Sequence, residues 1–376
     1  MANPLSSVLD SFSALFSGSK SGESVLGIDI GSSAIKVVQL RKRRGTAVLE
    51  TYGELALGPY SQVDIGRATN LSAEQLSTAL TDLIREANVT TRSVGVAVPF
   101  SASLITLIQM PNLPRKQLAE MIPIEARKYI PVPISEVTLD WFIVPQDESK
   151  FLSHEEKEKA QASNKVDVLV VAIHNEVLGK YQDVMERAGL SVSFYEIEIF
   201  SAIRAAIGQG VAPAMVIDMG AASTKVYLVE YGVVKSSHII NRGAQDVTFG
   251  LSKSTGISVT KAEELKRTEG LVRTDGQTTQ SILLTLEYIF SEANRVLLNY
   301  QKRFNKNIGQ VVLTGGGAAM KGLEEYAARH FETEVVLADP FAKVESPAFL
   351  EEVLEEVGPE FSVAVGVALR KLHEQG

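Results

Sequence analysis

The sequence contains no cysteine, so disulfides, a thiolate nucleophile and cysteine metal sites are excluded. No apolar run approaches the ~20 residues that span a bilayer, and the N-terminus lacks the cationic start and apolar core of a secretory signal. Basic residues are not in excess either, since 37 Lys and Arg against 45 Asp and Glu give a net charge of −8. A general nucleic-acid binder would carry a basic domain. We therefore expect a soluble cytoplasmic protein that is at most peripheral to a membrane.

Histidine is scarce, and its five copies show no H-x-x-x-H or similar spacing, so a histidine metal site is not predicted. At 376 residues the chain is too long for one ordinary core, and two to three domains are expected.

Residues 25–40 predict a β-hairpin, in which two apolar strands flank a turn at Gly31, Ser32 and Ser33. Asp29 stands where the first strand ends. A carboxylate there can hold a hydrated divalent cation, and the backbone N–H groups of small turn residues can cradle an oxyanion. An ordinary hairpin uses the same residues, so this turn alone leaves both interpretations open.

The same pattern returns at residues 217–226, where Asp218 lies 189 positions after Asp29. The residues that recur at this offset are Ile28, Asp29, Gly31, Lys36 and Val37, matched by Ile217, Asp218, Gly220, Lys225 and Val226. A shared hairpin in each half indicates two similar half-domains whose turns face one cleft. The repeat therefore favours the functional interpretation.

The remaining chain alternates strands and helices, which is typical of an α/β layered fold. The predicted strands lie at 47–56, 94–99, 103–110, 137–144, 167–173, 191–198, 308–313 and 335–337. The predicted helices lie at 72–88, 115–129, 175–188, 200–207, 245–254, 261–267, 279–304, from 321, and at 362–373. Ser72 is expected to cap the first helix, with Gln75 as its reciprocal partner. The polar stretch 146–165 predicts an exposed loop or ribbon.

Two further segments each allow two interpretations. Residues 1–24 predict either a flexible tail or a short amphipathic helix that docks on a partner or a lipid surface. The apolar residues at helical spacing are Val8, Leu9, Phe12, Leu15 and Phe16. The run from Arg41 to Arg44 follows a strand and indicates a solvated hairpin tip, with nucleic acid or anionic lipid as the alternative contact.

Three glycine-bearing turns, at 29–33, 218–224 and 314–317, each follow an apolar strand. Two hairpins can grip phosphates from opposite sides, and a third turn can approach adenosine closely because glycine has no Cβ. The two aspartates would hold water ligands of Mg²⁺. Phosphate-1, phosphate-2 and adenosine motifs in this order resemble the actin, sugar-kinase and heat-shock-chaperone superfamily.

Within that superfamily the chain most resembles the PilM family, actin-like proteins of type IV pilus assembly related to the cell-division protein FtsA. The resemblance is carried by residues 27–36, the α+β insert, 195–202 and 262–266. It implies an α/β, ribonuclease H-like fold with duplicated half-domains around a nucleotide cleft. The implied parts are a tail (1–24), a first subdomain (25–100 plus 189–212), an FtsA-like insert (101–188), a second subdomain (213–242 plus 308–376) and a helical subdomain (243–307).

The resemblance also implies ATP and Mg²⁺ as ligands and assigns residues by position. The first phosphate loop corresponds to Asp29, Gly31, Ser32 and Ser33 with Lys36, and the second to Asp218, Gly220, Ala222, Ser223 and Thr224. The adenosine turn corresponds to Gly315, Gly316 and Gly317 with Met320, and Glu263 and Lys266 correspond to ribose or adenine contacts. Asp29 and Asp218 would hold the metal, and Glu198 would orient the attacking water. A helix-start carboxylate explains Glu198 nearly as well.

Two residues depart from the superfamily pattern. The second loop reads Ala221-Ala222 where the chaperones have glycine, which makes tight closure on a γ-phosphate less assured. Lys225 repeats Lys36, and since other members vary at this site we expect an exposed lysine at a strand end.

Three functions remain open at this stage. The resemblance favours an ATP-binding scaffold with slow hydrolysis at most, which docks the short cytoplasmic tail of an inner-membrane PilN-like protein at the inner face of that membrane. The alternatives are a superfamily kinase or fast ATPase, and an FtsA-like polymerising membrane tether. A kinase needs a catalytic aspartate in a sugar pocket, and no sequence mark for one is found.

Overall fold

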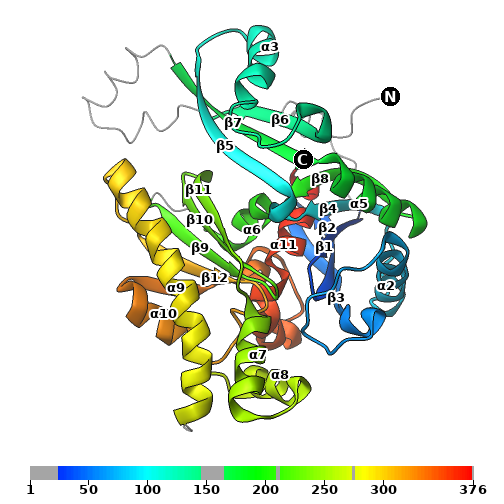
Figure 1. The fold of residues 1–376 in the computed structure, drawn as a ribbon. Coiled ribbons are helices and arrows are strands. Elements are labelled where there is room, and N and C mark those ends of the chain that lie inside the picture. Colours follow the sequence, from blue (N-terminus) through cyan, green and yellow to red (C-terminus); the bar gives the residue numbers. More distant parts are fainter. Residues whose placement is uncertain (1–23, 145–164, 209–211, 273–275, 375–376) are drawn as a thin grey trace.

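The computed structural model describes residues 24–144, 165–208, 212–272 and 276–374 (Figure 1). The predicted amphipathic helix or tail at the N-terminus and the polar stretch 146–165 lie outside these ranges, except for Ser24 and Lys165. Figure 1 shows two sheets side by side, with a third, smaller sheet above them and helices below.

The first sheet has the strand order β3-β2-β1-β4-β8. Its antiparallel strands are β1 (Ser24–Ile30), β2 (Ala34–Arg43) and β3 (Thr46–Ala56), and its parallel strands are β4 (Ser93–Val98) and β8 (Ser191–Ile197). β1 and β4 are almost fully buried apolar runs, as expected for strands covered on both faces.

The second sheet has the order β11-β10-β9-β12-β13 and repeats the first sheet strand for strand, with the same antiparallel and parallel neighbours. Its strands are β9 (Ala214–Met219), β10 (Thr224–Glu230), β11 (Val233–Ile240), β12 (Gln310–Thr314) and β13 (Glu334–Leu337). The predicted duplication is thereby confirmed. The sequence patterns had indicated the β9–β10 hairpin but not β11.

Helices α2 (Ala73–Glu86) and α5 (Asn175–Arg187) belong to the core of the first half. The predicted capping box at the start of α2 is present, since Ser72 and Gln75 bond reciprocally at 3.2 and 3.0 Å. Leu80 and Leu83 of α2 and Val184 of α5 are buried in one apolar cluster. Helix α5, which falls within the range predicted for the insert (101–188), thus packs in the core of the first half.

The insert is a three-stranded antiparallel sheet of order β5-β7-β6 with one helix. Its elements are β5 (Ser103–Pro111), α3 (Arg115–Ala126), β6 (Val137–Ile143) and β7 (Lys165–His174). Leu118 and Ile122 of α3 pack with Val168 and Val170 of β7 in a core separate from those of the two halves. The predicted division of the chain into subdomains stays a prediction.

Helices α6 (Glu198–Ala206) and α11 (Glu351–Glu374) pack against each other and against the first sheet. Close approach requires glycine at two points. A Cβ on Gly27 would overlap the Ala364 carbonyl of α11, and one on Gly366 would overlap the Ser201 carbonyl of α6. The closing helix was predicted from residue 362, but it begins at Glu351 and contains Pro359.

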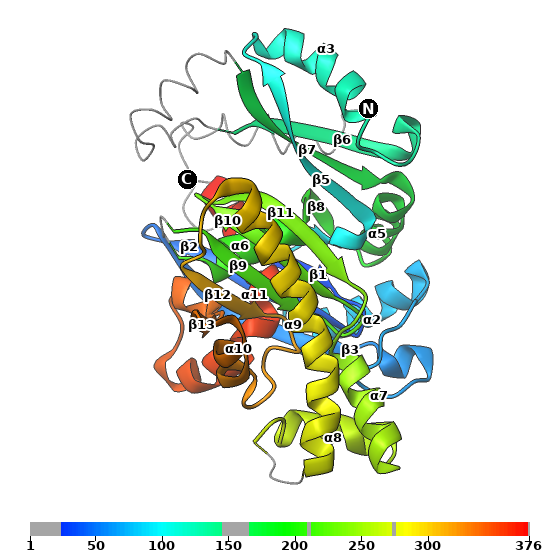
Figure 2. The ribbon, with the colours of Figure 1, turned by 60° about the vertical axis from the view of Figure 1, so that its left-hand side comes forward.

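Four helices of the described residues belong to the second half, and α9 is the long one that crosses in front of the second sheet in Figure 2. They are α7 (Ala244–Thr255), α8 (Val259–Thr268), α9 (Gly276–Phe304) and α10 (Leu323–Phe331). Short 3-10 turns complete the described chain at Gly58–Ser61, Phe100–Ala102, Ile134–Glu136, Pro340–Lys343 and Ala348–Leu350. α7 and α8 form the lower part of the molecule in Figure 1.

Candidate nucleotide site between the two halves

The two predicted phosphate loops have the same backbone bond at their turns. The Gly31 N–H donates to the Ala34 carbonyl at 3.0 Å, and the Gly220 N–H donates to the Ser223 carbonyl at 3.0 Å. Both members of each bond are 189 positions from their counterparts, so the sequence repeat is also a structural repeat.

The two turns line one cavity of about 280 Å³, close to the lower end of the ~300–1,000 Å³ typical of ligand sites. All the predicted site residues except Thr224 line it: Asp29, Gly31, Ser32, Ser33, Lys36, Glu198, Asp218, Gly220, Ala222, Ser223, Glu263, Lys266, Gly315, Gly316, Gly317 and Met320. Thr224 is fully buried and donates to the Arg242 carbonyl at 2.9 Å. Side chains alternate along β10, and Ser223 and Lys225 are the ones that line the cavity.

Lys225 contradicts the expectation of an exposed lysine. Its ammonium lies 2.8 Å from a Glu198 oxygen and 3.2 Å from an Asp218 oxygen, and its side chain is only 15% exposed. Burial alone would lower the pKa of Lys225, but Asp218 and Glu198 raise it above its usual value. Lys225 is therefore a fixed positive charge between the predicted metal residue and the predicted water-orienting residue.

The equivalent lysine of the first half has a different partner. Lys36 pairs across the hairpin with Asp29 in strand register, as Lys225 does with Asp218. Its ammonium, however, lies 3.5 Å from Glu54 of β3. Burial would lower the pKa of Lys36, but Glu54 and Asp29 raise it.

Asp29 has an unusual carboxyl group. Burial raises its pKa to about 6, and Lys36 only partly offsets this. A divalent cation or a cationic complex beside Asp29 would favour the charged form. The first half thus presents a carboxylate whose charge is not fully balanced by the protein.

Glu198 is the first residue of α6, as the helix-start explanation requires, while its role in orienting water stays a prediction. One oxygen accepts from the Phe100 N–H at 2.6 Å and the other from Lys225, while the side chain also lines the cavity. The carboxylate is held in place by these two donors.

The third glycine turn packs against the second phosphate loop. Gly315 has φ +83°, and a Cβ there would overlap an Asp218 carboxylate oxygen. A Cβ on Gly317 would come within 2.5 Å of the Met219 side chain, and the Gly317 N–H donates to the Met219 carbonyl at 2.8 Å. Only glycine permits this turn to approach the loop so closely.

On the opposite side α8 contributes a buried pair. Lys266 lies 2.6 Å from Glu263, which also accepts from Thr248 at 2.6 Å and from Arg267 at 2.7 Å. Burial lowers the pKa of Lys266 despite Glu263. Arg267 lines the cavity as well, although the sequence patterns did not single it out.

A second residue that the sequence patterns did not single out, the acid Glu360 of α11, lines the cavity near Lys36 and Gly316. Burial, followed by the neighbouring Glu54 carboxyl, raises its pKa to about 7. Glu54, Arg267 and Glu360 come from three distant parts of the chain, so no local pattern marks them.

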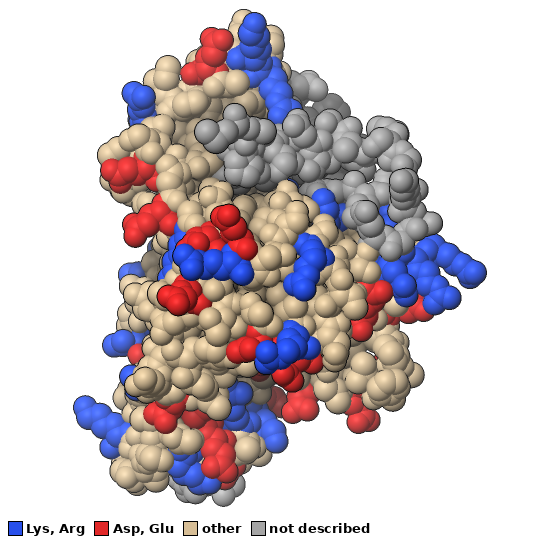
Figure 3. Space-filling view, turned by 90° about the vertical axis from the view of Figure 1, so that its right-hand side faces the viewer, with Lys and Arg blue, Asp and Glu red and all other residues tan. Residues whose placement is uncertain are grey.

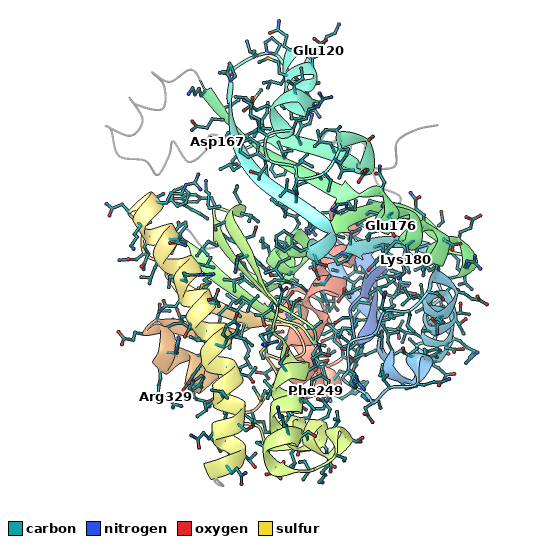
Figure 4. All side chains as sticks on the ribbon, in the orientation of Figure 1. Glu120, Asp167, Glu176, Lys180, Phe249 and Arg329 are labelled. Atoms are coloured by element: carbon teal, nitrogen blue, oxygen red, sulfur yellow. The ribbon has the colours of Figure 1, made fainter. Side chains whose placement is uncertain are left out.

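Contacts across the cleft join the two halves at its lower end. The Ala68 N–H donates to the Gln245 side chain at 3.1 Å, and Thr260 donates to Asp64 at 2.9 Å. The Arg67 guanidinium lies 5.5 Å from the ring centre of Phe249, which Figure 4 labels on α7. These contacts fix how the α7–α8 region meets the first half.

Within the described ranges, no three His, Asp or Glu side chains stand close enough to coordinate a metal directly. Asp29 and Asp218, the residues predicted to hold a hydrated Mg²⁺, both line the cavity, and that role stays a prediction.

Comparison with known proteins identifies the family of the chain. The family described as type IV pilus assembly protein PilM matches residues 27–372. The chain belongs to the PilM family. It takes its place, with that family, in type IV pilus assembly, and the predicted resemblance is confirmed.

A curated relative of this PilM-family chain is the cell division protein FtsA of Streptococcus pneumoniae, 22% identical over 365 residues, which cover 86% of this chain and 77% of the relative. Among solved structures, a PilM–PilN type IV pilus biogenesis complex is 26% identical with a TM-score of 0.76, covering 92% of this chain and 98% of that chain. MreB5 of Spiroplasma citri bound to AMPPNP is 12% identical with a TM-score of 0.51, covering 92% and 95%, and supports the fold alone. The predicted actin-like fold is confirmed.

No helix in the described part of the chain combines the length and the apolar character needed to cross a membrane.

Proposed function

We propose that this PilM-family chain is an ATP- and Mg²⁺-binding scaffold that docks the short cytoplasmic tail of a PilN-like inner-membrane protein. The observation that carries the nucleotide part is the single cavity onto which both repeated turns and the glycine turn open. The tail is supported by the similarity to the PilM–PilN complex. Such a scaffold would lie in the cytoplasm at the inner face of the inner membrane.

In this proposal each part of the cavity has one task. Turn N–H groups and Lys36 would hold the phosphates, Asp29 and Asp218 would hold the hydrated Mg²⁺, and the Gly315 turn with α8 would hold the nucleoside. ATP would supply a polyanion that bridges the two halves and fixes their relative position.

Hydrolysis would be slow, because the carboxylate that could orient water is already engaged. Glu198 accepts from both the Phe100 N–H and Lys225, so only its remaining lone pairs could take up a water molecule. This supports a scaffold over a fast ATPase or a kinase.

The nucleotide part is tested by calorimetric titration of ATP with Mg²⁺ into the purified chain and into Asp218→Ala. We expect saturable binding to the wild type and none to the variant. Unchanged affinity in Asp218→Ala would remove this residue from the site.

The docking part is tested with a fluorescent peptide of a PilN-like tail. The insert exposes Met121, Ile124 and Tyr129 on and just after α3, which supports a protein contact beside it. Ile124→Asp should weaken tail binding, whereas Val272→Asp should not, although both side chains are 66% exposed. Equal anisotropy titrations for the two variants would contradict docking at α3. Adding ATP should strengthen binding if nucleotide fixes the scaffold.

A further inference from the structure

The four basic residues from Arg41 to Arg44 form the tip of the β2–β3 hairpin. The turn places Arg44 at φ +52° and Gly45 at φ +89°. Two-residue turns of this kind favour Asn-Gly, because Asn tolerates a left-handed backbone better than Arg does. The chain thus has the positively charged Arg44 at a turn position that favours Asn.

More basic residues lie next to this tip. The Lys42 ammonium donates to the Leu372 carbonyl at 3.4 Å, which places the tip beside the C-terminal end of α11 and Lys371. Burial lowers the pKa of His373, and Arg204, Lys42 and Lys343 lower it further, so these cations surround the histidine. We call this surface the basic end. It comprises Arg41, Lys42, Arg43, Arg44, Lys343 and Lys371.

Acidic neighbours only partly neutralise the basic end. Arg41 pairs with Glu50 at 3.3 Å, and Glu345 lies nearby, where its backbone bonds to β3. In the described part of the chain neither Arg43 nor Arg44 has an ion pair. Figure 3 shows basic side chains projecting together at the right-hand edge of the molecule, where this hairpin ends. In a chain of net charge −8, this is a local reversal of sign.

We propose that the basic end binds the anionic headgroups of a membrane surface. The projecting tip offers point charges rather than rings that could stack on bases, because Arg41 to Arg44 include no aromatic residue. Each basic residue near an anionic leaflet strengthens binding by about fivefold. The choice of a membrane rests on the proposed function, which places the chain at the inner membrane.

Such a surface would orient the scaffold rather than anchor it. Four unpaired or weakly paired charges give reversible binding, and stable attachment needs a second signal, which the PilN-like tail would supply.

The experiment is flotation of the full chain with vesicles of phosphatidylcholine alone or with one-third phosphatidylglycerol. The test variant is Arg43→Glu/Arg44→Glu, and its control is Lys116→Glu/Arg127→Glu, which makes the same charge change at two exposed sites on and beside α3. We expect the wild type and the control to float only with anionic vesicles at low salt. The test variant should lose at least about twentyfold in partitioning, and Arg43→Lys/Arg44→Lys should retain binding.

Equal flotation of the two charge-reversed variants, or binding to neutral vesicles, would overturn the proposal. Binding to duplex DNA through the same arginines without vesicle binding would also overturn it. The assay needs neither ATP nor the tail. A wild type that floats but binds no ATP would therefore contradict the proposed function alone, while ATP binding by Arg43→Glu/Arg44→Glu confirms that this variant folds.

Discussion

Replacing Lys225 with methionine tests the electrostatic design of the cleft most directly. Methionine has nearly the same length but no charge, so Asp218 and Glu198 would lose the ammonium that lies 3.2 and 2.8 Å from them. Removing one partner of a buried ion pair costs about 3–5 kcal/mol of stability, because the remaining charges stay desolvated. We expect the melting temperature without ligand to fall by on the order of 10 °C.

The variant should also respond differently to ligands. Two unpaired carboxylates attract a divalent cation, so Mg²⁺ should raise the melting temperature of Lys225→Met more than that of the wild type. Glu198 would be released from its ammonium partner, and ATP turnover, followed by phosphate release, should rise.

Two controls separate this reasoning from general damage. Lys253→Met removes an exposed lysine on α7 and should change neither property. Lys225→Met combined with Glu198→Gln should lose less stability than the two single changes add up to, because they share one interaction. A Lys225→Met variant with unchanged melting temperature, or with ATP affinity and turnover lost together, would refute the role assigned to Lys225.

Three further outcomes follow from the structure. Gly315→Ala should weaken ATP binding in calorimetry, because its Cβ overlaps the Asp218 carboxylate and its φ of +83° strains alanine; unchanged affinity would contradict the close packing. Asp29 has a folded-state pKa of about 6 against 3.8 in the unfolded chain, so its contribution to stability falls by about 3 kcal/mol as the pH rises through that window. In Asp29→Asn, the free energy of unfolding from denaturant titrations should no longer fall between pH 4 and 6. The same fall in the variant as in the wild type would contradict the raised pKa of Asp29. Glu196 is buried with Arg204 and Arg370, which hold its pKa at about 2, so its stabilisation is present above its unfolded pKa of 4.5 and is lost as the pH falls toward 2. Glu196→Gln should cost about 3–5 kcal/mol at pH 7 by chemical denaturation, and a loss below 1 kcal/mol would contradict this account.

Short sequence patterns were sufficient to predict the elements that line the cleft. The β1–β2 and β9–β10 hairpins, the Ser72 cap and the glycine turn after β12 all depend on residues a few positions apart. The sequence offset of 189 then predicted the duplicated halves, which the strand order confirms. The resemblance supplied the family, which the match over residues 27–372 confirms.

The wrong or missing predictions depend on contacts between residues that are far apart in the sequence. Helix α11 was expected at residues 362–373, although proline usually interrupts helices and Pro359 lies inside the observed helix. The structure continues the helix through it, and the Pro359 carbonyl instead accepts from the Gly315 N–H at 2.9 Å and from Thr314 at 3.0 Å. The proline that disturbs the helix locally is thus also the residue that bonds the glycine turn. Glu54, Arg267 and Glu360 could not be found, since nothing near them in sequence marks a common site.

The wrong prediction for Lys225 could have been avoided from the sequence. Antiparallel pairing through the turn at Gly220 places Lys225 opposite Asp218, as Lys36 lies opposite Asp29. Counting the register of the repeat would therefore have put the lysine beside the aspartate. The partner that decides its role, Glu198, comes from another element and was not predictable from the hairpin.

The two halves share one hairpin design but differ in charge balance, and this difference divides the work of the cleft. In the second half the Lys225 ammonium lies 3.2 Å from Asp218 and 2.8 Å from Glu198 of α6, so it forms ion pairs with both carboxylates. In the first half Lys36 faces Glu54, and burial leaves Asp29 with a pKa of about 6. A divalent cation gains most where a carboxylate lacks a full partner, so Mg²⁺ should bind more strongly to the first half than to the second. On this reasoning Asp218 has a lysine partner before any ligand binds, whereas Asp29 would gain its strongest partner from the cation, and a nucleotide bound between them would join the two halves.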